Sequence, residues 1–360
     1  MSEPTHDCPA NSHPDRRRFI KVASSVAAGA MFAPAIHAAD KSGARPPVIG
    51  AGKHTYHAEH GWGRLPDHVR WGDTHGVCID AAGLVYIKHR SSAKEPMDAI
   101  CVFDADGKYV RSFGKEYHGG GHGIDVRKEG GEEFLYLSDI KNRQVVKTSL
   151  SGEQVWRLPY PQEPGVYKSA AGYRPTNVAF SPDGGFYIGD GYGSHYIHQY
   201  DKNAKWVRTF GGQGKEAGKL ATPHGLWLDD RGDEAKLVVA DRANARLQYF
   251  TLDGKHAGFV SEMSFPADID RRGDELLVPD LHARVTILGK DNEVLVHLGY
   301  HADWTETVLA DRFRMRGTPK EWQPGRFVHP HDACFDDSGN IFVVEWVPTG
   351  RVTKLTRADA

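Results

Sequence analysis

A short sequence phrase recurs six times along this chain of 360 residues, and it restricts the possible folds more than any other feature. Each copy has a β-rich run, an Asp/Gly turn, a second β-rich run, a polar residue and a third run. The copies start 43 to 64 residues apart, at His75, His122, Thr176, His224, Ala267 and His331. Short β-runs with turn signals at such intervals are typical of a β-propeller, in which one repeat forms one four-stranded blade. The sequence therefore predicts an all-β fold, a six-bladed β-propeller.

The polar residue that ends the second run is acidic in five copies: Asp139, Asp190, Asp241, Asp280 and Glu345. In the first copy, Arg90 lies near the equivalent point. Residues 241–246, and less closely residues 139–143, resemble the Asp-x-x-Asn-x-Arg turn of NHL repeats. This resemblance implies a propeller of the NHL type. The competing interpretation, a pair of two-sheet sandwiches, would not repeat one motif six times.

The last copy ends after its third run, at residues 351–355, so its blade lacks an outer strand. Strand-like pieces within residues 48–71 are expected to supply that strand and close the ring, which would leave no exposed sheet edge. A long polar insertion at about residues 300–328 separates the fifth and sixth copies. Such insertions usually lie on one face, often the binding face.

The first 39 residues are expected to be a cleaved export signal. Residues 15–21 read Asp-Arg-Arg-Arg-Phe-Ile-Lys, an Ala-rich apolar stretch follows, and Ala38 and Ala39 precede Asp40. Paired arginines before such a stretch indicate the twin-arginine export machinery as a partner. The stretch is too short to span a membrane. We therefore expect a propeller domain over residues 40–360, periplasmic or secreted, with no membrane span in the mature chain.

Charge and cysteine content exclude two further classes. Lys and Arg number 45 against 47 Asp and Glu, a balance that does not favour nucleic acid as a partner. Four cysteines, one of them within the expected signal, leave an odd number without zinc-ribbon spacing. The fold is therefore not expected to depend on disulfides.

Histidines begin the second, fourth and sixth copies, as His122, His224 and His331. The first residue of each innermost strand of a propeller faces the central channel, and alternate blades of a six-fold ring are about 120° apart. Three imidazoles then meet on the axis, which is the ligand set of a catalytic zinc site, although other divalent transition metals also accept imidazole. A lone channel histidine would more often be a structural hydrogen-bonding group.

Four sequence segments resemble peptidyl-α-hydroxyglycine α-amidating lyases. They are residues 187–192, 223–226, 238–248 and 330–332, which occur in the family's order. The resemblance covers residues 75–358 and implies zinc ligands at His122, His224 and His331. It also implies a structural calcium held by the carbonyl oxygens of Val77 and Ile124 and by the carboxylate of Asp332.

The same resemblance implies three catalytic residues, Tyr192, Arg90 and Arg242. In such a lyase an α-hydroxyglycine amide breaks at its C–N bond into an amide and glyoxylate. Zinc would stabilise the developing negative charge, and Tyr192 would accept the hydroxyl proton with help from nearby positive charge. The arginines would grip the substrate carboxylate. The expected substrate is a small or peptidic α-hydroxy acid amide.

The chain departs from the family at several positions. His75 stands where the family has a small residue, and His329 stands where an apolar residue is expected, so both are possible additional site residues. Family cysteines are replaced by Gly193, Val238 and Tyr249. Five other histidines have no arranged partners and are expected at the surface: His54, His57, His60, His195 and His198.

Two other functions remain open from the sequence. The first is a lactonase of the gluconolactonase type, although those propellers typically place carboxylates and asparagine around calcium. The second is a non-catalytic NHL scaffold that binds a partner on one face. The scaffold hypothesis predicts no tightly bound transition metal.

Overall fold

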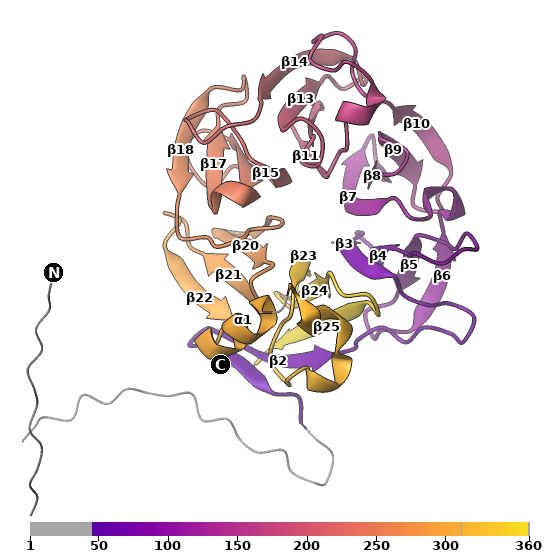
Figure 1. Cartoon of the computed structure of the whole chain (residues 1–360), viewed down its shortest axis with the longest axis vertical. Coiled ribbons are helices and arrows are strands. Elements are labelled where there is room, and N and C mark those ends of the chain that lie inside the picture. The colour runs from indigo at the N-terminus through magenta and orange to yellow at the C-terminus, as the bar shows by residue number, and fades with distance from the viewer. Residues whose placement is uncertain (1–44, 311, 359–360) are drawn as a thin grey trace, which may run out of the picture.

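The protein is a ring of six β-sheets around a central axis, shown in Figure 1 from a computed structural model. The structure describes residues 45–310 and 312–358. The predicted six-bladed propeller is confirmed. The predicted export signal at residues 1–39 lies outside the described residues and stays a prediction. The described residues contain no helix that is long and apolar enough to cross a membrane.

Five blades are antiparallel sheets of four strands that follow one another in sequence. The first blade has β3 (Asp73–Ile79), β4 (Val85–Arg90), β5 (Ile100–Phe103) and β6 (Tyr109–Phe113). The second has β7 (Gly121–Glu129), β8 (Glu132–Asp139), β9 (Gln144–Ser149) and β10 (Gln154–Leu158). The third has β11 (Asn177–Phe180), β12 (Phe186–Gly189), β13 (Tyr196–Tyr200) and β14 (Trp206–Gly211). The fourth has β15 (Pro223–Asp229), β16 (Lys236–Asp241), β17 (Arg246–Phe250) and β18 (His256–Val260). The fifth has β19 (Asp270–Arg272), β20 (Glu275–Asp280), β21 (Arg284–Leu288) and β22 (Val294–Leu298).

The sixth blade combines both ends of the described chain. Its strands are, from the axis outward, β23 (Pro330–Phe335), β24 (Ile341–Glu345), β25 (Arg351–Arg357), β2 (His54–His60) and β1 (Val48–Ala51). Strand β2 runs antiparallel to β25, with Tyr56 opposite Arg357 and His60 opposite Thr353. In Figure 1 the indigo strand β2 lies beside the yellow strand β25.

Strand sequences follow their position in the blade. The second strand of the fourth blade, Lys-Leu-Val-Val-Ala-Asp, is buried at every position after its first, because neighbouring blades cover both of its faces. The outer strand β18 alternates between half-buried and exposed residues, since one of its faces meets solvent.

Apolar side chains of adjacent blades interlock to form the core. One cluster joins Val77 and Ile87 of the first blade to Phe342 and Val344 of the sixth. Equivalent clusters lie between the other neighbouring blades, so burial is distributed around the ring. The rigid ring fixes where the first residue of each inner strand lies.

The acidic residue after the second strand ties each blade together. Asp241 is fully buried, and its carboxylate accepts hydrogen bonds from Asn244 Nδ2 (2.8 Å), Arg246 Nε (2.6 Å) and the backbone N–H of Ala221 (2.6 Å). Asn244 and Arg246 are the residues of the NHL-like turn. A buried carboxylate must be paired in this way, which explains the fixed polar position seen in the repeats.

The insertion between the fifth and sixth blades folds into short helices. They are α1 (Ala302–Leu309), η4 (Arg314–Gly317) and η5 (Pro319–Glu321). Trp304, Val308 and Met315 of this segment are buried against Val328 and Val347. The three remaining short helices are η1 (Lys115–Tyr117), η2 (Ala170–Gly172) and η3 (Arg242–Asn244).

Three cysteines and two histidines are buried in the blades. Cys78, Cys101 and Cys334 are free thiols. His54 and His198, expected at the surface, are buried. Both lie in strands, where their rings pack inward and bond polar side chains, His54 to Glu275 and His198 to Tyr167 and Thr209.

Candidate metal centre

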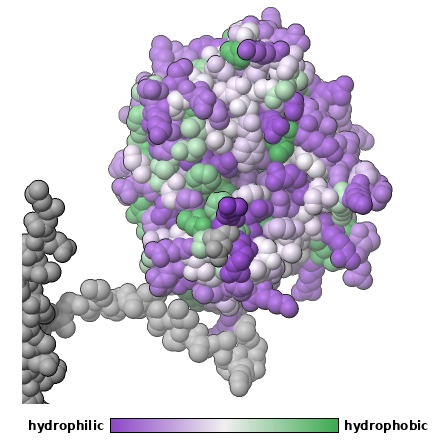
Figure 2. All heavy atoms as spheres, in the orientation of Figure 1, coloured by the Kyte–Doolittle hydropathy of each residue, from purple (hydrophilic) through white to green (hydrophobic). Residues whose placement is uncertain are grey.

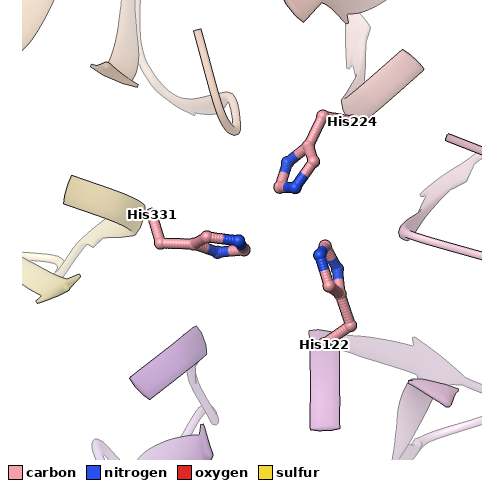
Figure 3. A group of neighbouring side chains, drawn as sticks. All are labelled: His122, His224 and His331. Atoms are coloured by element: carbon pink, nitrogen blue, oxygen red, sulfur yellow. The ribbon is translucent and has the colours of Figure 1, made fainter. Parts of the chain in front are cut away.

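Three imidazoles from alternate blades meet on the axis of the ring. His122 comes from β7, His224 from β15 and His331 from β23, and Figure 3 shows the three rings pointing toward one another. Their ring centroids are 4.6 to 4.9 Å apart. One ligand atom from each ring lies within 4.8 Å of the other two, so the three rings could hold one metal ion between them.

Each ring of this trio is oriented by the following blade. His122 Nδ1 lies 2.6 Å from the carbonyl oxygen of Thr176, and His224 Nδ1 lies 2.5 Å from that of Ala267. His331 Nδ1 lies 2.7 Å from the carbonyl oxygen of His75. A carbonyl only accepts, so each Nδ1 carries the proton and donates it, and each Nε2 keeps a lone pair. Such bonds orient metal-binding histidines and set their tautomer.

The electrostatics of the trio favour neutral rings. Burial is the main cause that lowers the pKa of His122 and His224 well below the ordinary value and that of His331 to about 3. For His224 and His331 the positive charge of Arg242 is the next cause, and for His122 it is the neighbouring His331. The Nε2 atoms of His122 and His331 are buried without a hydrogen-bond partner. Neutral imidazole nitrogens with free lone pairs are what a divalent transition metal binds, so the donor set fits such an ion.

The glycine after two of these histidines permits the close approach of the next blade. A Cβ on Gly123 would lie 2.7 Å from the carbonyl oxygen of Thr176, and one on Gly225 would lie 2.3 Å from the Cα of Asp268. Side chains at these positions would push away the strands whose carbonyls orient His122 and His224. The His-Gly pair in the repeat is therefore a packing requirement.

Tyr192 and Arg242 lie directly beside the trio. The hydroxyl of Tyr192 is 2.9 Å from His224 Nε2 and accepts a hydrogen bond from Arg242 Nη1 (3.2 Å). The guanidinium of Arg242 also lies 5.1 Å from the centre of the Tyr192 ring. The structure thus brings together two of the three predicted catalytic side chains with the predicted metal ligands.

Arg90 is held next to this group by an acidic partner. Arg90 Nη2 lies 3.2 Å from Asp73 Oδ2, and Asp73 Oδ1 lies 3.2 Å from Nη2 of Arg316, a residue of the insertion. Arg316 also stacks on Trp346, with its guanidinium carbon 3.3 Å from the ring centre. The sequence analysis did not identify Asp73 or Arg316. Asp73 lies two residues before His75 on one strand, a spacing that could have pointed to it.

A cavity of about 250 Å³ opens beside the trio, and Tyr192, Arg242 and His331 help to line it. Phe313, from the insertion, lies at its edge. The face of the ring toward the viewer in Figure 2 is mostly hydrophilic, and hydrophobic atoms occur there in small separate groups.

A second, acidic level lies farther along the inner strands. Val77, Asp268 and Asp332 line a common pocket there. Asp332 Oδ2 accepts a hydrogen bond from the backbone N–H of Val77 (2.8 Å). The carboxylate of Asp268 accepts hydrogen bonds from Asn177 Nδ2 (2.7 and 2.8 Å). Burial, and then repulsion from a neighbouring carboxylate, raises the pKa of both aspartates well above the ordinary value. Adjacent buried carboxylates fit a hard cation such as calcium.

Comparison with known proteins points to one family. A peptidyl-α-hydroxyglycine α-amidating lyase of Drosophila melanogaster is 26% identical over 293 residues, which cover 77% of this chain and 51% of that protein. The peptidylglycine α-amidating monooxygenase of Rattus norvegicus is 30% identical over 174 residues, 46% of this chain and 17% of that protein. The chain is similar in sequence to both of these proteins. It spans about half the length of the Drosophila lyase and a smaller part of the rat protein.

No protein-family model matches the chain. Solved structures support the fold alone. A streptogramin B lyase aligns with a TM-score of 0.54 and 13% identity, over 84% of this chain and 98% of that one. A virginiamycin B lyase from Staphylococcus aureus aligns with a TM-score of 0.54 and 12% identity, over 84% and 99%. Both share the arrangement of strands with this chain.

Two further histidines, His75 and His329, were predicted as possible additional site residues. His75 lies beside the trio, with its ring centre 4.5 Å from that of His331 and 5.5 Å from that of His122. Among the described residues, only His122, His224 and His331 lie close enough together to share one metal ion. His75 is therefore a neighbour of the candidate metal centre. The ring of His329 packs against Phe313 and Trp346 instead.

Gly225→Ala should weaken metal binding. The new methyl group would meet the backbone of Asp268, so the fifth blade must move and the Ala267 carbonyl must shift from His224 Nδ1. Loss of such an orienting contact typically lowers metal affinity about 10- to 100-fold. Metal titration followed by calorimetry measures the effect. Gly232→Ala is the control, since nothing lies within 4 Å of its Cβ, and equal affinities for both variants would contradict the prediction.

Proposed function

We propose that this chain is a metal-dependent lyase that cleaves the C–N bond of an α-hydroxyglycine-type amide, giving an amide and glyoxylate. One observation carries the proposal: His224 of the imidazole trio lies within hydrogen-bond distance of Tyr192, which in turn bonds Arg242, beside a cavity. The names of the related proteins support the lyase assignment. Their names also favour a substrate with a peptide-like amide.

His122, His224 and His331 would hold the ion, and zinc is the ion proposed. When bound, zinc supplies Lewis-acid stabilisation of the charge that develops on the substrate oxygen. Backbone carbonyls of the following blades keep each Nδ1 protonated, which leaves a lone pair on each Nε2. The Nε2 atoms of His122 and His331 have no partner, and that of His224 would exchange the Tyr192 hydroxyl for the ion. The rings are already oriented, which favours affinity.

The phenolate form of Tyr192 takes the proton from the hydroxyl of the substrate. Arg242 donates a hydrogen bond to the same phenol oxygen and places a positive charge beside it. As the C–O bond gains double-bond character, the C–N bond breaks and its electron pair remains on nitrogen. The amide nitrogen recovers the proton from Tyr192, so the products are the neutral amide and glyoxylate.

Arginines bind the carboxylate that becomes part of glyoxylate. Arg242 lines the cavity, and Arg90 contributes only one of its N–H groups to Asp73. A guanidinium has five such donors, so both arginines retain donors for a carboxylate. Asp73 bonds both Arg90 and Arg316. It therefore limits where Arg90 can move and positions this arginine.

The same observations support the two alternative functions less well. A lactonase of the gluconolactonase type is expected to surround its ion with carboxylates and asparagine. Such residues occur at the acidic level, whereas the cavity with Tyr192 and Arg242 lies beside the cluster of histidines. A binding scaffold does not require buried, oriented imidazoles beside a tyrosine–arginine pair. We therefore favour the lyase.

The decisive test is release of glyoxylate from α-hydroxyhippurate by protein purified without added metal. We expect stoichiometric glyoxylate and benzamide, about one transition-metal ion per chain, and loss of turnover after chelation that zinc restores. Detection of metal without glyoxylate from any α-hydroxyglycine amide would contradict the lyase assignment. Absence of both would favour the scaffold.

Calcium is proposed at the acidic level, with the carbonyls of Val77 and Ile124 and the carboxylate of Asp332 as ligands. Calcium at 100 times its Kd should stabilise the fold by about 2.7 kcal/mol, because it binds only the folded chain. Thermal unfolding with and without calcium measures the shift. Asp332→Asn should abolish the calcium-dependent shift, whereas the exposed control Asp253→Asn should retain it. An unchanged shift in Asp332→Asn would place calcium elsewhere.

A further inference from the structure

His329 has a buried nitrogen for which the fold supplies no partner. The residue is 1% exposed and lines the cavity beside the trio. Its Nδ1 lies 2.6 Å from the carbonyl oxygen of Leu281 and so donates the ring proton. Its Nε2 is buried and unbonded. A neutral imidazole in this tautomer has an acceptor lone pair at Nε2.

The position of His329 is firmly held. Glu345 Oε1 accepts hydrogen bonds from the backbone N–H groups of Val328 (2.6 Å) and His329 (3.2 Å). The backbone carbonyl of His329 accepts a hydrogen bond from the backbone N–H of Trp346 (2.8 Å). The ring packs edge-on against Phe313, with centroids 5.2 Å apart. The ring of His329, which is part of the cavity lining, is therefore held in one place.

The wall around this acceptor is largely apolar and aromatic. Phe265, Leu281, Phe313 and Trp346 line the same cavity. A cavity of about 150 Å³ lined by apolar side chains is large enough to bind benzene. The present cavity, of about 250 Å³, has room for a substituted ring.

We propose that this cavity is an acyl-group subsite in which His329 selects substrates whose aromatic ring carries a hydrogen-bond donor, such as a phenol O–H or an indole N–H. The inference rests on the proposed function, because it takes the acyl part of an α-hydroxyglycine amide as the occupant. A buried acceptor left without a partner costs about 1–3 kcal/mol. A donor on the substrate removes that cost, whereas a plain ring leaves it. The site then distinguishes two ligands of almost equal size.

His329 does not belong to the metal centre in this arrangement. Its ring contacts Phe313 and Trp346, while the rings of the trio contact one another. Tyr192 and Arg242 line the cavity together with His329, so a single ligand can reach both groups. The carboxylate end would lie at the arginine and the ring at His329.

The experiment compares benzoylglycine with its three hydroxybenzoylglycine isomers as ligands. These probes lack the α-hydroxyl group and cannot react, so calorimetric Kd values test the subsite even if the chain is not a lyase. We expect at least one isomer to bind the wild-type protein about 10- to 100-fold more tightly than benzoylglycine, as expected of a satisfied buried acceptor. Equal Kd values for all four ligands would overturn the proposal.

His329→Asn is the matched variant. Its amide N–H₂ can keep the bond to the Leu281 carbonyl, while the acceptor at the position of Nε2 is lost. The preference for the hydroxylated ligand should fall to less than about 3-fold. Both ligands are compared on the same protein, so a reduced folded fraction cancels from the ratio. His329→Leu provides a second variant, and His297→Leu, in the outer strand β22, provides a histidine control that should keep the preference.

Two outcomes separate this inference from the proposed function. A wild-type preference that disappears in His329→Asn, without glyoxylate release from hydroxylated α-hydroxyhippurates, supports the subsite and contradicts the lyase. Glyoxylate release with the same preference in wild type and His329→Asn supports the lyase and contradicts the subsite.

Discussion

Replacing His331 with alanine is expected to remove the bound transition metal and to lower kcat/KM for glyoxylate release at least about 1,000-fold. His331 is chosen because its Nε2 has no protein partner, whereas that of His224 also bonds Tyr192. A metal ion contributes several kilocalories per mole of charge stabilisation, which corresponds to a rate factor of this size. Elemental analysis and the glyoxylate assay measure the two effects together.

His198→Ala is the matched control for this substitution. His198 is equally buried, but it lies in β13 and bonds Tyr167 and Thr209 through its two nitrogens. Both variants lose a buried imidazole, so both should unfold at a lower temperature than the wild type. Only His331→Ala should lose the metal. If His331→Ala retains a full equivalent of metal, the trio is not the binding site.

Tyr192→Phe is expected to lower kcat about 100- to 10,000-fold, with KM nearly unchanged. The substitution removes only the hydroxyl group that would accept the proton, and general-base catalysis contributes a factor of this order. Metal content should not fall, because the imidazole of His224 stays in place. The substitution removes only the hydroxyl that contacts its Nε2. Steady-state kinetics and metal analysis of the same preparation distinguish this result from loss of the ion.

Tyr196→Phe is the control, because it removes a phenol hydroxyl from a tyrosine other than Tyr192. Tyr196 packs against Tyr167 and His198 in the third blade. Its substitution should leave kcat within about 2-fold of the wild type, since surface-type changes away from a site have small effects. Full activity of Tyr192→Phe would show that another group accepts the proton.

The repeat pattern was sufficient to predict the ring. Second strands such as β16 and β20 are nearly continuous apolar runs that end in an aspartate, and each run had to be buried on both faces. Six such runs at similar spacing left few alternatives to a closed propeller. The histidines at the starts of β15 and β23 then had to point toward one axis.

The hydrogen-bond partners of those histidines could not be predicted from the repeat pattern. The Nδ1 of His331 bonds the carbonyl of His75, which lies 256 residues away, and any residue type supplies a carbonyl. The side chains of Thr176 and Ala267 therefore give no signal of their part in orienting His122 and His224. Similarly, Asp73 and Arg316 are 243 residues apart, and only the folding of the insertion brings them together.

The amino-acid sequence alone determined the number of blades and the approximate start of each inner strand, to within three residues, since side-chain alternation and turn chemistry act between near neighbours. Tertiary structure alone decided the tautomers of the trio, the partner of Arg90 and the aromatic wall around His329. Those features depend on contacts between segments remote in sequence, whose distances follow from how the blades pack.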